Sequence, residues 1–497
     1  MSDLSEIIEG LDGAELHGDA EGVSVLSLAM DTRRVEPGAL FFCVPGVNRD
    51  GHDFAADAVA SGASALVVER VLPDVSVPQI VVPSTRAAMG PIADRTFEQP
   101  SKRMDVFGVT GTNGKTTTTY LLRAMFAAAG RQMGMIGTTG IVVGGQERDA
   151  DSTTPDAIQL HGLLRDMVDA GDDSAAIEVS SHALDQKRAQ NVRYAAVGFT
   201  NLTRDHLDYH RSFEAYYQAK RLLFTQPGPE GQHFPAAINC DDEWGSRLFD
   251  ELVHAEREDV PVWGWTLREM ARASVSASFA LLPDGASIKV ESPVGDFALK
   301  SRLRGRFNVE NVLTAATMAL LGGLTPEDIQ AGLDAVAGVR GRFEPVEAGQ
   351  AFTVLVDYAH TPDSLEQVLT SGRAICDGKL IVVFGCGGDR DRSKRPLMGR
   401  AAALGADLAI ITSDNPRSED PVTIIAEIKR GMRSGADIVE EPDRRAAIEL
   451  AMREAEAGDL VIIAGKGHEQ GQTFATETVP FDDVTVARDA LEAAGVA

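Results

Sequence analysis

The sequence predicts an α/β protein with more than one domain, and three features of the chain support that prediction. The chain has 497 residues, too many for one ordinary hydrophobic core. Short apolar runs alternate with longer Ala- and Leu-rich amphipathic stretches along its whole length, as strands and helices do in α/β folds. Residues 105–130 read as a strand, a Gly-rich loop and a helix, an order typical of nucleotide-binding domains.

The composition excludes several classes of protein. A hydrophobic content of 44% with 24% charged residues is typical of a globular chain, and the net charge of -27 argues against non-specific nucleic-acid binding. The first residues lack a basic and apolar leader, and no apolar run reaches the ~20 residues of a membrane helix. The four cysteines form no C-x-x-C pair, which suits a reducing compartment. We therefore expect a cytoplasmic protein without membrane insertion.

Two polar segments look like linkers between domains. TFEQPSKRM precedes the strand DVFGVTG and places a boundary near residue 103. VAGVRGRFEPVEAG follows an Ala- and Leu-rich helix and places a second boundary near residue 338. The expected domains are therefore residues 1–103, 104–338 and 339–497.

In the last third of the chain, three apolar strand runs each end in a polar loop. The runs are KLIVVFG, ADLAIIT and GDLVIIAG, and their loops are CGGDRDRSKRP, SDNPRSEDP and KGHEQG. The carboxyl ends of parallel strands line one crevice, where ligands bind. The residues expected to converge there are Arg390, Asp414, Arg417, Lys466 and Glu469. The alternative is that these are ordinary solvated loop charges.

The Gly-rich loop at 111–114 is predicted to bind phosphate. Gly111 and Gly114 would let backbone N–H groups approach phosphate oxygens, Lys115 would reach the β- and γ-phosphates, and the Thr116 hydroxyl would hold Mg²⁺. The strict phosphate-loop pattern is not met, because Val109 stands where its first Gly belongs. A Gly-rich turn that only caps a helix is the structural alternative. The loop alone leaves kinase, switch GTPase and ligase open.

The variant G-T-N-G-K-T at 111–116 resembles the Mur ligase family, and later segments extend the resemblance in the same order along almost the whole chain. These segments are TTPDAIQL (153–160), EVSSHAL (178–184), NLTRDHLDYH (201–210), RGRFNVENVLTA (304–315), GRFE (341–344), DYAHTPDSL (357–365), GCGGDRDRSKRP (385–396), DNPRSEDP (414–421) and AGKGHEQGQ (464–472). The resemblance implies a three-domain Mur ligase architecture: an N-terminal UDP-substrate domain, a central P-loop ATPase domain and a Rossmann-like C-terminal domain that binds the amino acid.

The reaction that the resemblance implies is an ATP-dependent ligation in cytoplasmic peptidoglycan synthesis. ATP, UDP-N-acetylmuramoyl-L-alanyl-D-glutamate and meso-2,6-diaminopimelate would give the tripeptide, ADP and phosphate. Because hydroxide is a poor leaving group, the carboxylate must first become an acyl phosphate that an amine can attack. Both steps build negative charge on phosphate oxygens, so metal ions and positioned cations are expected rather than a protein nucleophile.

The resemblance also assigns roles in the central domain. ATP would contact Gly111, Thr112, Asn113, Gly114, Lys115, Thr116, Thr117, Asn311, Arg342 and Asp357, with Asn308 as a further candidate. Mg²⁺ ligands would be Thr116, Glu178, His206 and Lys220, and the catalytic set would be Lys115, Lys220, His206 and Glu178. Lys220 would be carbamylated to N6-carboxylysine. The alternatives are a helix-capping role for Glu178, a structural role for His206 and a solvated helix face for Lys220.

Two further sets of residues would bind the other substrates. The UDP-substrate would contact Thr32, Thr153, Thr154, Ser180, Gln186 and Arg188, although Ser152 stands where the family often has Asn. Diaminopimelate would contact Arg390, Asp414, Asn415, Pro416, Arg417, Gly465 and Glu469. A second carboxylate calls for a cation, and the arginine of D-N-P-R is typical of the diaminopimelate-adding relatives. Alternatively, Arg417 pairs only with Glu419 or Asp420.

Other functions stay open from the sequence. The same family contains a lysine-adding ligase, and folylpolyglutamate synthases share the phosphate loop. A nucleotide-regulated binding protein and a catalytically inactive paralogue are further alternatives. We expect a monomer.

Overall fold

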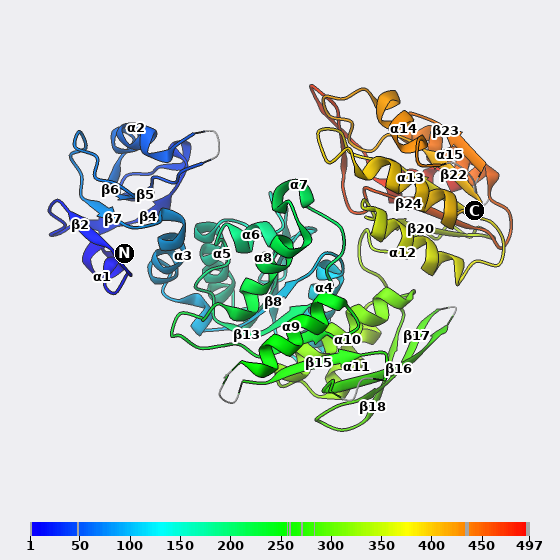
Figure 1. Ribbon diagram of the computed structural model, residues 1–497, viewed down its shortest axis with the longest axis horizontal. Helices are drawn as coiled ribbons and strands as arrows, with labels where there is room; N and C mark the ends of the chain where they lie inside the picture. The colour runs from blue at the N-terminus through cyan, green and yellow to red at the C-terminus, as the bar shows by residue number, and fades with distance from the viewer. Residues whose placement is uncertain are drawn as a thin grey trace.

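The computed structural model describes residues 2–46, 49–255, 257, 260–269, 272–282, 284–432 and 437–493. Three large sheets, each with its own helices, follow one another along the chain (Figure 1). The α/β class predicted from the sequence is confirmed. The boundaries expected near residues 103 and 338 lie between consecutive sheets, and as domain limits they stay predictions.

The first sheet, in the blue lobe of Figure 1, has the order β2-β7-β6-β5-β4. Its strands are β2 (Glu15–His17), β4 (Ser27–Ala29), β5 (Ala39–Phe42), β6 (Ala63–Val68) and β7 (Gln79–Val81). Strands β4 to β7 are parallel, and β2 runs antiparallel to β7. Helix α3 (Thr85–Thr96) follows β7 and contacts α5 (Ala157–Asp169), so this helix joins the first lobe to the central one.

The central sheet has eleven strands in the order β11-β10-β9-β12-β8-β13-β14-β15-β16-β17-β18. The strands are β8 (Asp105–Thr110), β9 (Met133–Gly137), β10 (Gly140–Val143), β11 (Gln146–Arg148), β12 (Ser174–Glu178), β13 (Tyr194–Phe199), β14 (Ala236–Asn239), β15 (Val262–Thr266), β16 (Val275–Leu282), β17 (Gly285–Glu291) and β18 (Phe297–Ser301). Pairing is parallel from β9 to β16, and antiparallel hairpins extend both ends. The carboxyl ends of β8, β12 and β13 therefore meet at one edge.

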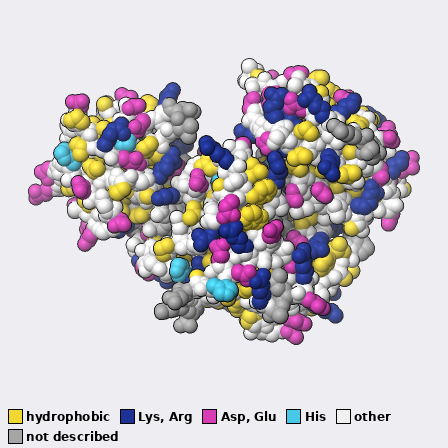
Figure 2. All heavy atoms as spheres, in the orientation of Figure 1, with side chains coloured by type: hydrophobic (Ala, Val, Ile, Leu, Met, Phe, Trp, Pro, Cys, Tyr) yellow, Lys and Arg dark blue, Asp and Glu magenta, His cyan; other side chains and the backbone are white. Residues whose placement is uncertain are grey.

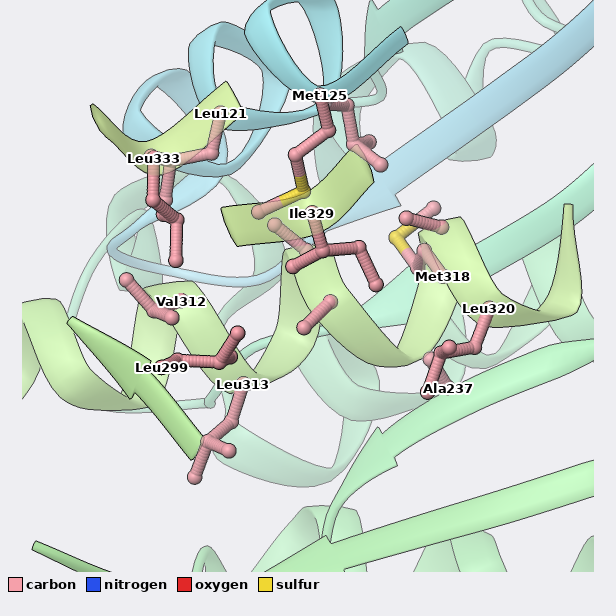
Figure 3. Packing of buried hydrophobic residues seen from close by; sticks show 14 of the residues in the cluster. Leu121, Met125, Ala237, Leu299, Val312, Leu313, Met318, Leu320, Ile329 and Leu333 are labelled. Carbon is pink, nitrogen blue, oxygen red and sulfur yellow. The ribbon is translucent and has the colours of Figure 1, made fainter. Parts of the chain in front are cut away.

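Helices cover both faces of the central sheet. Helices α4 (Lys115–Ala128), α10 (Arg306–Leu321) and α11 (Pro326–Ala335) pack on one face through Leu121, Met125, Val312, Met318, Ile329 and Leu333 (Figure 3). Helices α5, α8 (Phe213–Thr225) and α9 (Glu243–His254) cover the other face. This burial fixes the sheet edge from which the phosphate loop projects.

The third sheet has the order β19-β20-β24-β21-β22-β23, in which β20 to β23 are parallel. Its strands are β19 (Glu344–Pro345), β20 (Thr353–Asp357), β21 (Leu380–Phe384), β22 (Leu408–Ile411), β23 (Asp437–Glu440) and β24 (Leu460–Ala464). Its two faces are covered by α12 (Pro362–Arg373), α13 (Lys394–Gly405) and α14 (Pro421–Lys429), and by α15 (Arg444–Glu454) and α16 (Asp483–Ala493). The three apolar runs predicted as buried strands are β21, β22 and β24, and their continuous apolar sequence reflects burial on both faces.

Positive and negative side chains are interspersed over the face shown in Figure 2, and a notch opens at its upper edge between the N-terminal and C-terminal lobes. Among the described residues, no helix is long and apolar enough to cross a membrane.

Candidate active site

The phosphate loop connects the buried strand β8 to helix α4. Gly111 has a φ of 154° and Gly114 a φ of 88°, and both glycines lie tightly against neighbouring side chains. A Cβ at Gly111 would lie 1.8 Å from the Thr200 hydroxyl, and one at Gly114 would lie 2.2 Å from the Asn311 amide oxygen. Both positions therefore require glycine, and the loop is held against β13 and α10 instead of being a free turn.

Two cations reach this loop. The Lys115 ammonium donates to the carbonyl oxygens of Gly111 (2.9 Å) and Thr112 (2.8 Å), and burial lowers its pKa. Arg342, which follows the central lobe, donates to the Thr116 hydroxyl at 3.1 Å and lies over the Tyr358 ring. Positive charge from two distant parts of the chain therefore surrounds the start of α4, where the helix dipole also favours an anion.

A cavity of about 220 Å³ opens in front of the loop. Its lining contains most of the predicted ATP and metal residues, namely Thr112, Asn113, Gly114, Lys115, Thr116, Thr117, Glu178, His206, Asn311, Arg342 and Asp357. Asn308 is buried behind it, where its amide donates to Arg304 and accepts from Asn311. We call this the nucleotide cavity.

Asp357 shapes the side of the nucleotide cavity that comes from the third sheet. It ends β20 and is 6% exposed, and its carboxylate accepts from the backbone N–H groups of Phe343 and Ala359. Burial raises the pKa of this carboxyl group. Through its hydrogen bond with Phe343, Asp357 therefore ties the segment that contains Arg342 to the carboxyl end of β20.

Glu178 is the buried carboxylate of the nucleotide cavity. It ends β12 with 1% exposure, and its two oxygens accept from the backbone N–H and the hydroxyl of Thr138. Ser180, not Glu178, caps the following helix α6 (Ser181–Asp185), so the helix-capping role considered from the sequence is not what the structure shows. The carboxylate of Glu178 and the hydroxyl of Thr116 line the same cavity, and oxygen atoms of these kinds are the ligands that Mg²⁺ prefers.

No cluster of three or more His, Cys, Asp or Glu side chains that could hold a metal by itself is found among the described residues. Mg²⁺ commonly binds through one or two carboxylates together with substrate phosphates. Thr116, Glu178 and His206 line the same cavity as the phosphate loop, so the donor set fits a metal that arrives with a nucleotide.

The Lys220 side chain does not lie on a solvent-exposed face of its helix. It is 1% exposed on α8, its ammonium donates to the Gly111 carbonyl at 2.7 Å, and it lies 4.5 Å from the centre of the Tyr216 ring. Burial, followed by the nearby positive charge of Lys115, lowers the pKa of Lys220 well below its ordinary value. The structure places it behind the phosphate loop and not in the lining of the nucleotide cavity.

The predicted UDP-substrate residues do not all lie together. Thr153 and Ser180 line the nucleotide cavity, whereas Gln186 and Arg188 line a second cavity of about 200 Å³. Thr154 is 1% exposed, and its hydroxyl donates to the Glu178 carbonyl, which is a structural bond.

Thr32 lies in the short helix η1 (Thr32–Arg34) of the first lobe. The second cavity also contains Arg86 at the start of α3, which the sequence reasoning missed. Its position after the end of a parallel strand was the available signal.

The predicted diaminopimelate residues converge on a third cavity, of about 450 Å³. Its lining includes Arg390, Asp414, Asn415, Arg417, Gly465 and Glu469. Lys466 is fully buried and supports this wall, because its ammonium donates to Asn415 (2.9 Å) and to Glu469 (3.0 Å). Pro416 places its carbonyl against Gly388 instead of lining the cavity. We call this the amino-acid cavity.

Arg417 forms no ion pair with Glu419 or Asp420, the acidic residues that follow it in the sequence. Glu419 accepts from the buried Arg395 at 2.7 and 2.9 Å, and Asp420 caps α14 by accepting from two backbone N–H groups. The Arg417 guanidinium donates to the Gly388 carbonyl at 2.8 Å and forms no ion pair with a described carboxylate. The interpretation of Arg417 as a loop-stabilising partner of Glu419 or Asp420 is therefore wrong.

Buried ion pairs support the amino-acid cavity from below. Arg444 is 1% exposed, pairs with Asp483 at 2.7 Å, and donates to the carbonyls of Ser413 and Ala464. These carbonyls immediately precede Asp414 and Gly465, so the pair holds the ends of β22 and β24 together. The sequence reasoning missed Arg395 and Arg444, because an arginine on a helix gives no local sign of burial.

The chain is similar to known proteins along almost its whole length. The chain matches the Mur ligase family catalytic domain at residues 25–96, the Mur ligase middle domain at 109–319 and the Mur ligase glutamate ligase domain at 341–467. It is 43% identical over 493 residues to a UDP-N-acetylmuramoyl-L-alanyl-D-glutamate–2,6-diaminopimelate ligase of Geobacillus thermodenitrificans, covering 98% of this chain and 99% of the relative. A Gloeobacter violaceus protein of the same name is 43% identical, covering 94% of each chain.

Solved structures give the same result. A structure described as UDP-N-acetylmuramoyl-L-alanyl-D-glutamate–2,6-diaminopimelate ligase matches with a TM-score of 0.71 and 35% identity over 99% of both chains. The MurF ligase of Thermotoga maritima, solved with ADP, matches with a TM-score of 0.63 and 16% identity over 94% of this chain and 97% of that one, which shows the fold alone. The family-model matches and the near-full-length relatives together establish that this chain belongs to the Mur ligase family.

Proposed function

We propose that this chain uses ATP to join meso-2,6-diaminopimelate to UDP-N-acetylmuramoyl-L-alanyl-D-glutamate in cytoplasmic peptidoglycan precursor synthesis. The relatives that it matches over almost their full length carry this activity in their names. The structural observation that carries the proposal is a pair of arginines, Arg390 and Arg417. Both line the amino-acid cavity, and neither forms an ion pair with a described carboxylate.

The nucleotide cavity would perform the first step. The γ-phosphoryl group of ATP passes to the substrate carboxylate, and charge builds on its oxygens as it moves. Lys115 and Arg342 are positioned to stabilise this charge, and the N-terminus of α4 adds its backbone N–H groups. We propose that Thr116, Glu178 and His206 hold Mg²⁺ with the nucleotide, and that this ion would neutralise phosphate charge when bound.

Lys220 has the environment that carbamylation requires. Only the neutral amine can add carbon dioxide, and burial beside Lys115 disfavours the ammonium. The product is an anion with two oxygen ligands, and we propose that it would bind Mg²⁺ from behind the phosphate loop. The uncharged amine and the carbamate both avoid two buried cations next to each other.

The amino-acid cavity would select diaminopimelate. The second carboxylate at the far carbon of this amino acid would pair with Arg417 and Arg390, since a guanidinium binds a carboxylate through two parallel hydrogen bonds. We propose that Asp414 and Glu469, which both line this cavity, bind the ammonium groups. L-Lysine lacks the second carboxylate and would leave the arginines unpaired.

A panel of amino acids tests this proposal directly. Phosphate release is measured with ATP and the UDP-dipeptide supplied, and with each amino acid added separately. We expect release with meso-diaminopimelate and little with L-lysine. Comparable release with L-lysine would assign the chain to the lysine-adding ligases instead. Release that needs neither the UDP-dipeptide nor an amino acid would indicate a nucleotide-regulated binding protein. We further propose that the protein acts as a monomer, which the measured mass in solution tests.

A further inference from the structure

Four residues line both the nucleotide cavity and the amino-acid cavity: Asp205, His206, Tyr358 and His360. The acyl phosphate forms on the nucleotide side, and the attacking amine comes from the amino-acid side. Any group that takes a proton from this amine must therefore stand where the two cavities meet. Such a group is needed because the α-amino group of an amino acid is mostly an ammonium at neutral pH, and an ammonium has no lone pair.

His360 is held rigidly at this junction. It lies in the loop between the end of β20 and the start of α12, where a capping box at Thr361 fixes the chain. Its ring lies against the Tyr358 ring at 4.6 Å, and its backbone carbonyl accepts from the Lys394 ammonium at 2.9 Å. The loop therefore has little freedom to turn the ring away.

The hydrogen bonds of His360 determine its tautomer. Nδ1 lies 2.9 Å from the Tyr358 carbonyl oxygen, which can only accept, so Nδ1 carries the proton. In the neutral ring the lone pair is then on Nε2. No hydrogen bond to Nε2 is found among the residues that the structure describes. His360 thus presents an unused proton acceptor at the place where the two cavities meet.

The charges around the ring suit a group that is neutral at rest. Burial and the positive charge of Lys394 lower the pKa of His360, while Asp205 and Asp414 act in the opposite direction. The ring is therefore neutral at pH 7, and two carboxylates are close enough to stabilise the imidazolium that forms when it accepts a proton.

The other three residues at the junction are less suited to this role. Burial raises the pKa of Tyr358 to about 12, so its hydroxyl keeps its proton. The Asp205 carboxylate accepts from the His206 backbone N–H and lies 3.3 Å from the His206 ring. His206 is the proposed metal ligand.

We propose that His360 is the general base that deprotonates the α-ammonium of the incoming amino acid. Nε2 takes one proton, and the nitrogen lone pair that this frees forms the C–N bond with the acyl carbon as the C=O π pair moves onto oxygen. When that pair returns, the C–O bond to the phosphoryl group breaks and inorganic phosphate leaves with its electrons. The extra N–H proton of the new amide passes to solvent. This assignment rests on the proposed ligase function.

Two substitutions separate the base from its structural role. His360→Asn keeps a side-chain nitrogen near the Nδ1 position, where it can donate to the Tyr358 carbonyl, and it lacks Nε2. His360→Gln fills the Nε2 position with an amide that cannot act as a base. His468→Asn is the matched control, because His468 packs on the same Tyr358 ring and lines neither cavity.

Each variant is given ATP, the UDP-dipeptide and one of two nucleophiles. Meso-diaminopimelate needs a base, whereas hydroxylamine is mostly uncharged at neutral pH and does not. We expect both His360 variants to lose about 10²–10⁴-fold in kcat for amide formation. Hydroxamate formation should stay at the wild-type rate, and His468→Asn should leave the ratio of the two products unchanged.

The pH profile gives an independent readout. The wild-type kcat with diaminopimelate should fall on the acid side, where His360 becomes protonated. The His360→Asn rate should instead rise steadily with pH, as the amine loses its proton in solution. Equal losses with both nucleophiles, or no loss with diaminopimelate, would overturn the assignment. A wild-type protein that forms neither product would show that the proposed function itself is wrong.

Discussion

The nucleotide and amino-acid cavities lie side by side, but the cationic side chains at the two cavities have different partners. In the nucleotide cavity, the Lys115 ammonium is held by two backbone carbonyls of its own loop. Beneath the amino-acid cavity, Arg395 and Arg444 are buried and paired with acids, whereas Arg390 and Arg417 line the cavity and pair with none of the described carboxylates. The phosphate loop of the nucleotide cavity is built from consecutive residues. At the amino-acid cavity, the ion-paired Arg395 and Arg444 hold three separate loops in place. Arg390 and Arg417 are then available for the ligand.

The largest effect should follow from the local site. Lys115→Ala removes the phosphate-loop cation, and we expect turnover to fall by about 10²–10³-fold or more while the fold is kept. Phosphate release measures the loss, and circular dichroism confirms folding. Lys102 pairs with Glu230 outside both cavities, so the control variant Lys102→Ala should keep the wild-type turnover. Undiminished turnover by a folded Lys115→Ala protein would contradict the role of the loop.

Lys220→Ala should lose most activity, because it removes the group behind the phosphate loop that we expect to be carbamylated. Short carboxylic acids such as formate should restore part of it by supplying oxygen ligands, and intact-protein mass should show one CO₂ on the wild-type chain. Arg221→Ala changes the next residue of α8, which pairs with Glu251, and should retain activity. Lack of the added mass under CO₂-rich conditions would count against the modification.

The buried layer beneath the amino-acid cavity should affect stability more than chemistry. Arg444→Met leaves Asp483 buried and unpaired, so we expect a loss of about 3–5 kcal/mol in the free energy of unfolding. The KM for diaminopimelate should rise as well, since the carbonyls before Asp414 and Gly465 lose their donor. Denaturant titration and steady-state kinetics measure the two effects.

Two further variants sharpen that prediction. Arg445→Met removes an exposed arginine whose ion pair with Asp489 is 3.6 Å long, and it should cost less than about 1 kcal/mol. Arg444→Met combined with Asp483→Leu removes the uncompensated charge and should recover much of the stability. A single Arg444→Met variant as stable as the wild type would show that the pair does not support the cavity.

The smallest effect is expected far from both cavities, between α3 and α5. Asp94 and His161 lie 3.6 Å apart and are buried, and burial raises the pKa of Asp94 to about 6. A carboxyl group whose pKa is raised on folding stabilises the protein at low pH, and this contribution is lost as the pH rises through 6. Asp94→Asn should therefore raise Tm more at pH 8 than at pH 5, because at pH 5 the folded carboxyl group is still mostly protonated. A variant that lowers Tm equally at both pH values would contradict this account.

The sequence correctly predicted the strand, Gly-rich loop and helix around residues 105–128, because these residues are contiguous and their spacing alone indicates that order. Phosphate binding by the loop stays a prediction. The sequence also predicted which strand-end loops would converge, since parallel strands bring their carboxyl ends to one edge. It could not show that Glu419 belongs to Arg395 and not to Arg417, because that choice depends on how α13 packs. Nor could it show that His360 lies between the two cavities, since its motif does not reveal which cavities a loop separates.

We propose that Arg390 and Arg417, which pair with none of the described carboxylates, select the second carboxylate of diaminopimelate. The most direct test compares kcat/KM for meso-diaminopimelate and L-lysine in the wild type and in Arg417→Ala. We expect the wild type to prefer diaminopimelate by about 2–5 kcal/mol, because L-lysine leaves a charge unpaired. Arg417→Ala should remove most of that preference while the KM for ATP stays unchanged. A wild type that uses both amino acids equally, or a preference unchanged in Arg417→Ala, would contradict the claim.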